Sequence, residues 1–219
     1  MDIQGRNILI LGGSGLVGLA IARKLLPLEP NRVVIAALRR DEAEVGVQTL
    51  ADEGFGSGGE LVAEWGDIFL RTARRDESRR EMLATDEGRE EILNDLFGHL
   101  GEKEFRRSLL YDLLARHRPE IVIDCVNTAT AIAYQDLFRS ASTIRELIRS
   151  GGHPTVADIE AHLTTLYLPQ LIRHEQVLLH GMREAGSQVY LKVGTSGTGG
   201  MGLNVPFTHS EERPSAMLL

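Results

Sequence analysis

The feature that most restricts the fold of this sequence is a glycine-rich stretch that directly follows a short apolar run. Residues 8–11 are all isoleucine or leucine, which is typical of a strand buried on both faces of a parallel sheet. Glycines follow at positions 12, 13, 15 and 18, and apolar residues then continue with helical spacing up to Pro27. The chain is therefore predicted to begin with a strand, a tight turn and a helix.

This arrangement suits a bound pyrophosphate. Glycines let the backbone approach a ligand closely and let the helix pack tightly on the strand, while the helix N-terminus offers free N–H groups. The spacing fits both G-x-G-x-x-G and G-x-x-G-x-x-G. The predicted cofactor-binding residues of the turn are Gly12, Gly13, Ser14, Gly15, Leu16, Val17 and Gly18. The alternative is a glycine-rich turn that holds no ligand.

Composition restricts the class of protein. The 219 residues suffice for one sizeable core, so we expect a single domain over residues 1–219. A net charge of −7 argues against nucleic acid as a partner. The single cysteine, Cys125, excludes a disulfide framework and is expected to act as a small core residue. No apolar run reaches the ~18 residues of a membrane span and no signal peptide is recognisable, which predicts a cytoplasmic protein without a membrane partner.

Two further strand ends carry candidate cofactor residues. A second strand is predicted over residues 32–38, and Arg39 and Arg40 follow it. Arginine at this position accommodates the 2′-phosphate of NADP, whereas an acidic residue favours NAD. The sequence therefore favours NADP, with NAD as the open alternative if both arginines are merely solvated. A third strand over residues 61–65 is followed by Asp67 and Ile68, where a carboxylate could accept from adenine or could cap a helix.

The remaining pattern alternates helices and strands. Residues 70–117 predict two or three helices, with residues 71–80 as a solvated, ion-paired helix; phosphate recognition by its arginines is the alternative. A fourth strand over residues 119–129 has Asn127 and Thr128 at its end, beside the expected cofactor cleft. A helix over residues 130–150 and a long helix ending at Ala185, bent at Pro169, precede a fifth strand at 189–193. The predicted fold class is α/β, a doubly wound parallel Rossmann-type sheet with a helical elaboration at about 70–118.

No metal site is predicted. His174 and Glu175 begin like a zinc-protease helix, but position 178 is leucine, so the His-Glu-x-x-His pair is incomplete. A P-loop is excluded because no Gly-Lys-Ser/Thr follows the glycines.

Taken together, these motifs resemble the short-chain dehydrogenase/reductase superfamily, in its extended, NAD-dependent epimerase/dehydratase-like branch. The resemblance covers nearly the whole chain apart from residues 70–118. It is carried by Gly12, Gly15 and Gly18, by residues 66–68, 119–127 and 177–186, by residues 193–196, and by the loop residues 206–214.

The resemblance implies an NAD(P)-binding fold in which the three glycines hold pyrophosphate, Asp67 touches adenine and Asn127 borders the cleft. It also implies that Ser196, or Thr195, is the catalytic residue that hydrogen-bonds the reacting oxygen. The family's catalytic base, a tyrosine with lysine four positions later, has no match. Tyr111, Tyr134, Tyr167 and Tyr190 are followed at that distance by Ala115, Phe138, Leu171 and Gly194.

Two interpretations follow. In one, the chain is the N-terminal part of a longer protein whose base lies beyond Leu219, and it is an NAD(P)-dependent oxidoreductase or epimerase/dehydratase-like enzyme. It would act on a carbonyl or secondary alcohol of a small-molecule substrate. In the other, it is a catalytically inactive module that binds or senses a dinucleotide. The family also allows a homodimer. The sequence names neither the substrate nor the purpose of residues 70–118.

Overall fold

The computed structural model describes residues 2–57, 59–126 and 137–193. Within them, one five-stranded sheet has the order β3-β2-β1-β4-β5, and all four strand pairs are parallel. The strands are β1 (Asn7–Leu11), β2 (Arg32–Ala37), β3 (Glu60–Trp65), β4 (Ile121–Asp124) and β5 (Val189–Lys192). All five predicted strands are thus confirmed, and the doubly wound parallel sheet with them.

The strands of the sheet centre are buried on both faces, which explains their continuous apolar sequence. Ile8 pairs with Val33 and Ile121, and these side chains belong to one core cluster. Their neighbours Leu9, Val34 and Val122 pair in the same way and belong to a second cluster on the opposite face. Each face therefore needs its own layer of helices.

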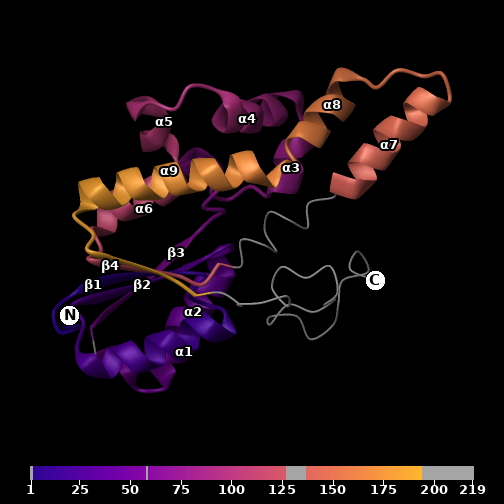
Figure 1. Cartoon of the computed structure of the whole chain (residues 1–219). Helices are drawn as coiled ribbons and strands as arrows, with labels where there is room; N and C mark the ends of the chain where they lie inside the picture. Colours follow the sequence, from indigo (N-terminus) through magenta and orange to yellow (C-terminus); the bar gives the residue numbers. More distant parts are fainter. Residues whose placement is uncertain (1, 58, 127–136, 194–219) are drawn as a thin grey trace.

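Two pairs of helices supply these layers (Figure 1). Helices α1 (Leu16–Leu25) and α2 (Arg40–Asp52) cover one face, to which they contribute Ala22 and Leu50. Helices α6 (Leu109–His117) and α9 (Tyr167–Ala185) cover the other, with Leu110, Leu113 and Leu178 in its core. The chain passes from one side of β1 to the other between β3 and β4, so the topological switch point lies at the carboxyl ends of β1 and β4.

The elaboration between β3 and α6 is more finely divided than the two or three helices predicted for residues 70–117. It contains a 3₁₀ turn, η3 (Thr72–Arg74), and three short helices before α6, namely α3 (Arg79–Leu83), α4 (Asp86–Phe97) and α5 (Glu102–Arg107). Capping boxes or side-chain caps begin α3 at Ser78 and α4 at Thr85. These caps divide a stretch that its apolar spacing alone had joined.

The prediction of a solvated helix over residues 71–80 was wrong. The side chain of Arg71 is only 20% exposed and pairs with Asp95 at 2.6 Å and with Glu91 at 3.2 Å, both on α4. Arg74 also reaches Glu91. Besides the local pair of Arg74 with Glu77, the partners of these arginines come from α4, about twenty positions away, so the segment is packed against α4 rather than solvated.

The long helix predicted to end at Ala185 is interrupted rather than bent. α8 (Val156–Leu163) ends before α9 begins at Tyr167, two residues ahead of Pro169. Proline is tolerated in the first turn of a helix but not in its interior, where its ring collides with the preceding turn. The buried side chain of Gln170 donates to the carbonyl of the buried Thr164 at 2.6 Å and so supplies a partner to the C-terminal end of α8. Gly186 ends α9 with φ +78°, as predicted.

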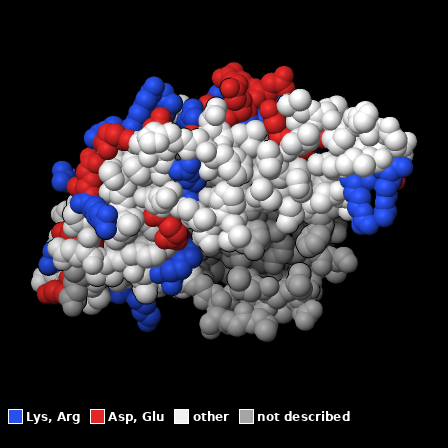
Figure 2. Space-filling view, turned by 45° about the horizontal axis from the view of Figure 1, so that its top comes forward, with Lys and Arg blue, Asp and Glu red and all other residues white. Residues whose placement is uncertain are grey.

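The face of the molecule shown in Figure 2 has an acidic area beside an uncharged one. In Figure 2, acidic side chains gather at the top of the view, where α4 carries the exposed Asp86, Glu87 and Glu90. An uncharged area lies below them, and α9 presents the exposed Leu168, Ile172 and Leu179. Helix α7 (Leu137–Arg149) extends from α8 at the side (Figure 1). Among the described helices, none combines the length and apolarity that a membrane crossing requires.

Candidate functional site

The glycine turn joins the carboxyl end of β1 to the N-terminus of α1, beside the switch point. Gly12 has φ +70°, and a Cβ there would lie 3.1 Å from the backbone of Cys125, just after β4. At Gly13 a Cβ would lie 2.9 Å from the carbonyl of Ile10, and at Gly18 one would lie 2.5 Å from the carbonyl of Gly12. Each of these glycines is therefore required by the packing of the turn itself.

Gly15 differs from the other three. A Cβ there would meet only the carbonyl of Gly12, at 3.4 Å, which is an ordinary contact. Its φ of −72° and ψ of 167° suit any residue. Nothing in the described structure thus requires glycine at position 15. The absence of a side chain leaves an exposed cradle, and backbone approach to a pyrophosphate is the role of the middle glycine in a dinucleotide-binding turn.

The N-terminus of α1 is prepared for an anion. Gly15 is the N-cap residue, no side chain of the described residues caps the helix, and the first turn contains no acidic residue. The N–H groups of a first helical turn have no partner within the helix and carry the positive end of its dipole. Leu16 is 74% and Val17 44% exposed, so apolar side chains surround the turn. Ser14 lies on the other side, where α2 packs closely at Gly46.

The two arginines after β2 are in different situations. Arg39 is 63% exposed and its guanidinium contacts Asp41 at 2.9 Å and Glu42 at 3.4 Å. Arg40 pairs with Glu44 at 2.8 Å and also lies over the ring of Trp65, 4.7 Å from its centroid. Exposed pairs such as Arg39–Asp41 are weak. Arg39 can therefore turn toward a phosphate more easily than Arg40, which an aromatic contact also holds.

Asp67 and Ile68 follow β3 as predicted, but they face different surroundings. One Asp67 carboxylate oxygen accepts the N–H of Phe69 at 2.9 Å. Burial raises the pKa of the Asp67 carboxyl, against the hydrogen bond from Phe69 and the nearby charge of Arg79. The side chain of Ile68 is 8% exposed and belongs to the core beneath α6 and α9. A contact between Asp67 and adenine stays a prediction.

Sequence reasoning missed a cluster at the end of β4. Asp124 is fully buried and its Oδ2 accepts from the hydroxyl of Tyr190 at 2.9 Å and from Nζ of Lys192 at 2.7 Å. Tyr190 and Lys192 are two residues apart on β5, so they share one face of the sheet. Burial and the charge of Asp124 raise the pKa of Tyr190 well above its usual range. Tyr190 is thus a hydrogen-bond donor to Asp124 and unsuited to act as a base near neutral pH.

Of the remaining residues named from the sequence, four cannot be compared with the structure and one, Cys125, can. Asn127, Thr128, Thr195 and Ser196 lie outside the described residues. Cys125 packs beside the core under α1, and burial together with the charge of Asp124 raises its thiol pKa to about 11. A thiol with such a pKa is protonated near neutral pH, so the prediction of an inert Cys125 agrees with its surroundings.

Another buried charge network, formed by Glu64, Arg75, Arg116 and His117, lies between β3 and α6. Glu64 is 6% exposed, and its carboxylate contacts Arg75 at 2.8 Å, Arg116 at 2.6 Å and His117 at 2.8 Å. Burial raises the pKa of Glu64, but hydrogen bonds from the three partners outweigh it and hold the pKa well below its usual range. The network joins the sheet edge to the α6 layer.

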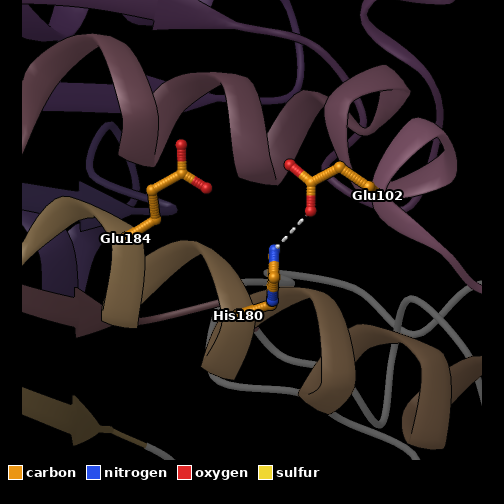
Figure 3. Close-up of side chains that lie close together, drawn as sticks. All are labelled: Glu102, His180 and Glu184. Atoms are coloured by element: carbon orange, nitrogen blue, oxygen red, sulfur yellow. Dashed lines mark ion pairs between the residues drawn. The ribbon is translucent and has the colours of Figure 1, made fainter.

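A third cluster brings Glu102, His180 and Glu184 together, with ligand atoms all within 4.8 Å of one another. Figure 3 shows the three side chains pointing toward a common space between α5 and α9. Nε2 of His180 lies 3.4 Å from Glu102, but Arg106 contacts Glu102 at 2.7 Å and the Tyr111 hydroxyl donates to Glu184. The ring of Phe105 also stacks on His180. Since both carboxylates already have partners, we assign this cluster to holding α5 against α9.

Because of the buried His174 on α9, we expect the free energy of unfolding to depend on pH. His174 is 4% exposed, and its burial lowers its pKa from 6.5 to about 4. The charge of Lys192 on β5 acts in the same direction, and the charge of Asp124 on β4 opposes it. The unfolded chain therefore binds more protons between these values, so stability decreases as the pH falls from about 6.5 to about 4, by about 3 kcal/mol.

Unfolding by urea at a series of pH values measures this effect. In His174→Leu this part of the loss over that window should be absent, while His153→Leu, which replaces an exposed histidine, should follow the wild-type curve. Parallel curves for wild type and His174→Leu would contradict the assignment.

No family model and no curated protein matches the sequence. Solved structures with similar chains include Pen from Bacillus thuringiensis, at 14% identity and a TM-score of 0.37, covering 89% of this chain and 54% of that one. An L-sorbose reductase from Gluconobacter frateurii, in complex with NADPH and L-sorbose, has 15% identity and a TM-score of 0.28, covering 88% and 97%. An A-type ketoreductase from a modular polyketide synthase has 14% identity and a TM-score of 0.35, covering 90% and 38%.

This chain thus spans about half the length of the first of these structures and nearly the full length of the second. Sequence identities of 14–15% and TM-scores of 0.28–0.37 indicate a similarity in the general arrangement of helices and strands only. The description of the fold rests on its own strand order and register.

Proposed function

We propose that this chain binds a nicotinamide dinucleotide at the turn formed by residues 12–18 and belongs to an oxidoreductase or epimerase/dehydratase-like protein acting on a carbonyl or secondary alcohol. The observation that carries the proposal is Gly15, which the fold does not require and which leaves an exposed cradle at an uncapped helix N-terminus. Its place beside the switch point of a parallel sheet is where ligands bind in such folds.

The residues present suit the parts of a dinucleotide. The N–H groups of Leu16, Val17 and Gly18 would hold the pyrophosphate. Arg39 would hold a 2′-phosphate, and Asp67 would accept from adenine. We propose Asn127 and Thr128 for the border of the cleft and Ser196, or Thr195, for the hydrogen bond to the reacting oxygen. The bound nicotinamide supplies or accepts hydride.

Whether the protein has a catalytic base decides between an enzyme and a catalytically inactive module that binds or senses a dinucleotide. The side chains of Tyr190 and Lys192 both donate hydrogen bonds to Asp124, so we place the catalytic base outside the described residues. If the natural protein has no such base, the same site serves a dinucleotide-binding or sensing module. We also carry forward a small-molecule substrate, a homodimer and a cytoplasmic location as proposals.

Two measurements on the full natural protein separate the alternatives. Calorimetric titration with NADPH and NADH tests binding, and the loss of reduced-nicotinamide absorbance with a panel of aldehydes, ketones and keto sugars tests turnover. Binding with turnover supports the enzyme, and binding without turnover across the panel supports the module. No binding of either nucleotide would reject both.

The preference between NADP and NAD should depend on Arg39. In Arg39→Ala we expect NADPH to bind roughly tenfold more weakly, because a charge-assisted contact to the 2′-phosphate is lost, while NADH binding changes little. Asp41→Asn removes the nearer of the two carboxylates that compete for Arg39, the other being Glu42, and should strengthen NADPH binding. Arg80→Ala, another exposed arginine, is the control. Equal effects of Arg39→Ala on both nucleotides would show that Arg39 does not contact the 2′-phosphate.

A further inference from the structure

A hollow separate from the glycine turn lies under the helical elaboration. It is enclosed by the segment after β3, by α3, α4, α5 and α6, and by α9. Figure 1 shows α4 and α5 lying beyond α9 from the sheet. Ile92, Leu96, Leu110 and Val177 give it apolar walls. Small-molecule sites are commonly lined in this way, by apolar side chains with a few polar groups among them.

His174 lines this hollow without a hydrogen-bond partner. Its side chain is 4% exposed, and neither Nδ1 nor Nε2 has a partner among the described residues. Its ring lies against Phe69, with centroids 4.8 Å apart, so the ring is held in place by an apolar contact. A buried imidazole without partners is costly. A neutral imidazole offers one donor and one acceptor, which a bound molecule could satisfy.

The same hollow holds two guanidinium groups bound to carbonyls. Nη2 of Arg79 donates to the carbonyl of Thr164 at 3.1 Å, and its buried Nε has no partner among the described residues. Arg173 donates to the carbonyls of Leu96 and Gly98. A carbonyl contact leaves the positive charge of each group uncompensated.

The acidic groups of the lining are engaged elsewhere. Asp95 pairs with Arg71, and Glu104 accepts the N–H of Gly101. Burial lowers the pKa of Arg79, and the negative charge of Asp67, which follows β3, acts in the opposite direction. Among the described residues no carboxylate forms an ion pair with Arg79 or Arg173, and only the charge of Asp67 partly offsets that of Arg79, so an anion fits these two groups.

From the hollow, the unpartnered His174 and the two guanidinium groups, we infer that this chain binds a small organic carboxylate between α4, α5 and α9. The carboxylate contacts Arg79, the rest of the polar head contacts His174, and an apolar body fills the space between Ile92 and Val177. This inference does not rest on the proposed function, because the glycine turn, Arg39 and Arg40 take no part in it.

A carboxylate panel with matched neutral amides tests the inference. We name benzoate, phenylacetate, 4-methylpentanoate and phenylpyruvate, with benzamide, phenylacetamide and 4-methylpentanamide as controls for charge. Calorimetry and heteronuclear NMR on the full chain would be the measurements. At least one acid should bind, at least tenfold more tightly than its amide, and should shift the signals of the α4–α9 hollow rather than those of the glycine turn.

Two variants and their controls locate the site. Binding of the selected acid should weaken at least tenfold in Arg79→Gln and in His174→Leu. It should be unchanged in Arg80→Gln, the exposed neighbour on α3, and in His153→Leu. His174→Leu guards against a folding defect, since it removes an unpartnered buried polar group and should be at least as stable as wild type near neutral pH.

Three outcomes would overturn the inference. These are no binding by any acid of the panel, equal binding of an acid and its amide, and wild-type affinity in His174→Leu. Failure of dinucleotide binding with carboxylate binding intact would reject only the proposed function, so the two can fail separately.

Discussion

Glu64→Gln is expected to lower the free energy of unfolding by about 3–5 kcal/mol, because it removes the buried carboxylate that Arg75 and His117 contact, while the more exposed Arg116 keeps Asp112. Arg75, Arg116 and His117 all contact this carboxylate, which is itself 6% exposed. A neutral amide keeps nearly the same volume but cannot balance two guanidinium groups. Equilibrium unfolding in urea near neutral pH is the measurement.

Glu60→Gln is the matched control for this loss. Glu60 begins the same strand and pairs with Arg32 at 2.6 Å, but its side chain is 56% exposed, so we expect a change of about 0–1 kcal/mol. The network also predicts the direction with pH. The pKa of Glu64 is lowered in the folded protein, so its contribution is present above the unfolded pKa of about 4 and is lost as the pH falls further. A Glu64→Gln loss no larger than that of Glu60→Gln would contradict the account.

Gly18→Ala should both destabilise the fold and abolish nucleotide binding. A methyl group there would lie 2.5 Å from the carbonyl oxygen of Gly12 and 2.6 Å from Cα of Gly13, both backbone atoms that cannot rotate away. Helix α1 must therefore move from the turn, which we expect to cost about 1–3 kcal/mol. Displacement of the helix N-terminus removes the N–H groups from the pyrophosphate, so affinity for NADPH should fall at least roughly a hundredfold, or about 3 kcal/mol.

Urea unfolding and calorimetric titration of Gly18→Ala measure the two effects separately. Gly15→Ala on the same turn is the control for stability, because its methyl group meets no backbone atom closer than 3.4 Å. We expect that change to cost no more than about 1 kcal/mol. Wild-type stability in Gly18→Ala would show that the packing of the turn on α1 is looser than the structure indicates.

The parts of this fold that could be predicted from sequence are those fixed by neighbours along the chain. The apolar residues 8–11 and the glycines after them specify a strand and a turn locally, and the structure has both. Gly186 likewise ends α9, because glycine, which has no Cβ, adopts a φ of +78° without strain. Such features need no knowledge of distant partners.

What sequence reasoning missed depends on contacts between distant residues. Arg71 and Arg74 looked like members of a solvated helix, yet their partners Glu91 and Asp95 come from another helix. Glu64 stood in a strand with no local sign that α6 would bring Arg116 and His117 to it.

The hollow around His174 was missed for the same reason, since it is assembled from four separate segments. His174 was considered at the sequence level only as half of a zinc pair. Helical spacing could have placed it, with Gln170, Val177 and Leu178, on the buried face of α9, and a lone histidine on that face was the available signal.

The most direct test of the central claim is NADPH titration of wild type and Gly15→Ala by calorimetry, with urea unfolding of both. If the turn holds a pyrophosphate, Gly15→Ala should remain within about 1 kcal/mol of wild-type stability and bind NADPH at least roughly tenfold more weakly, because its methyl group occupies the cradle. Equal affinity in the two proteins, or no binding by wild type, would show that Gly15 is open for another reason and that the turn does not hold a dinucleotide.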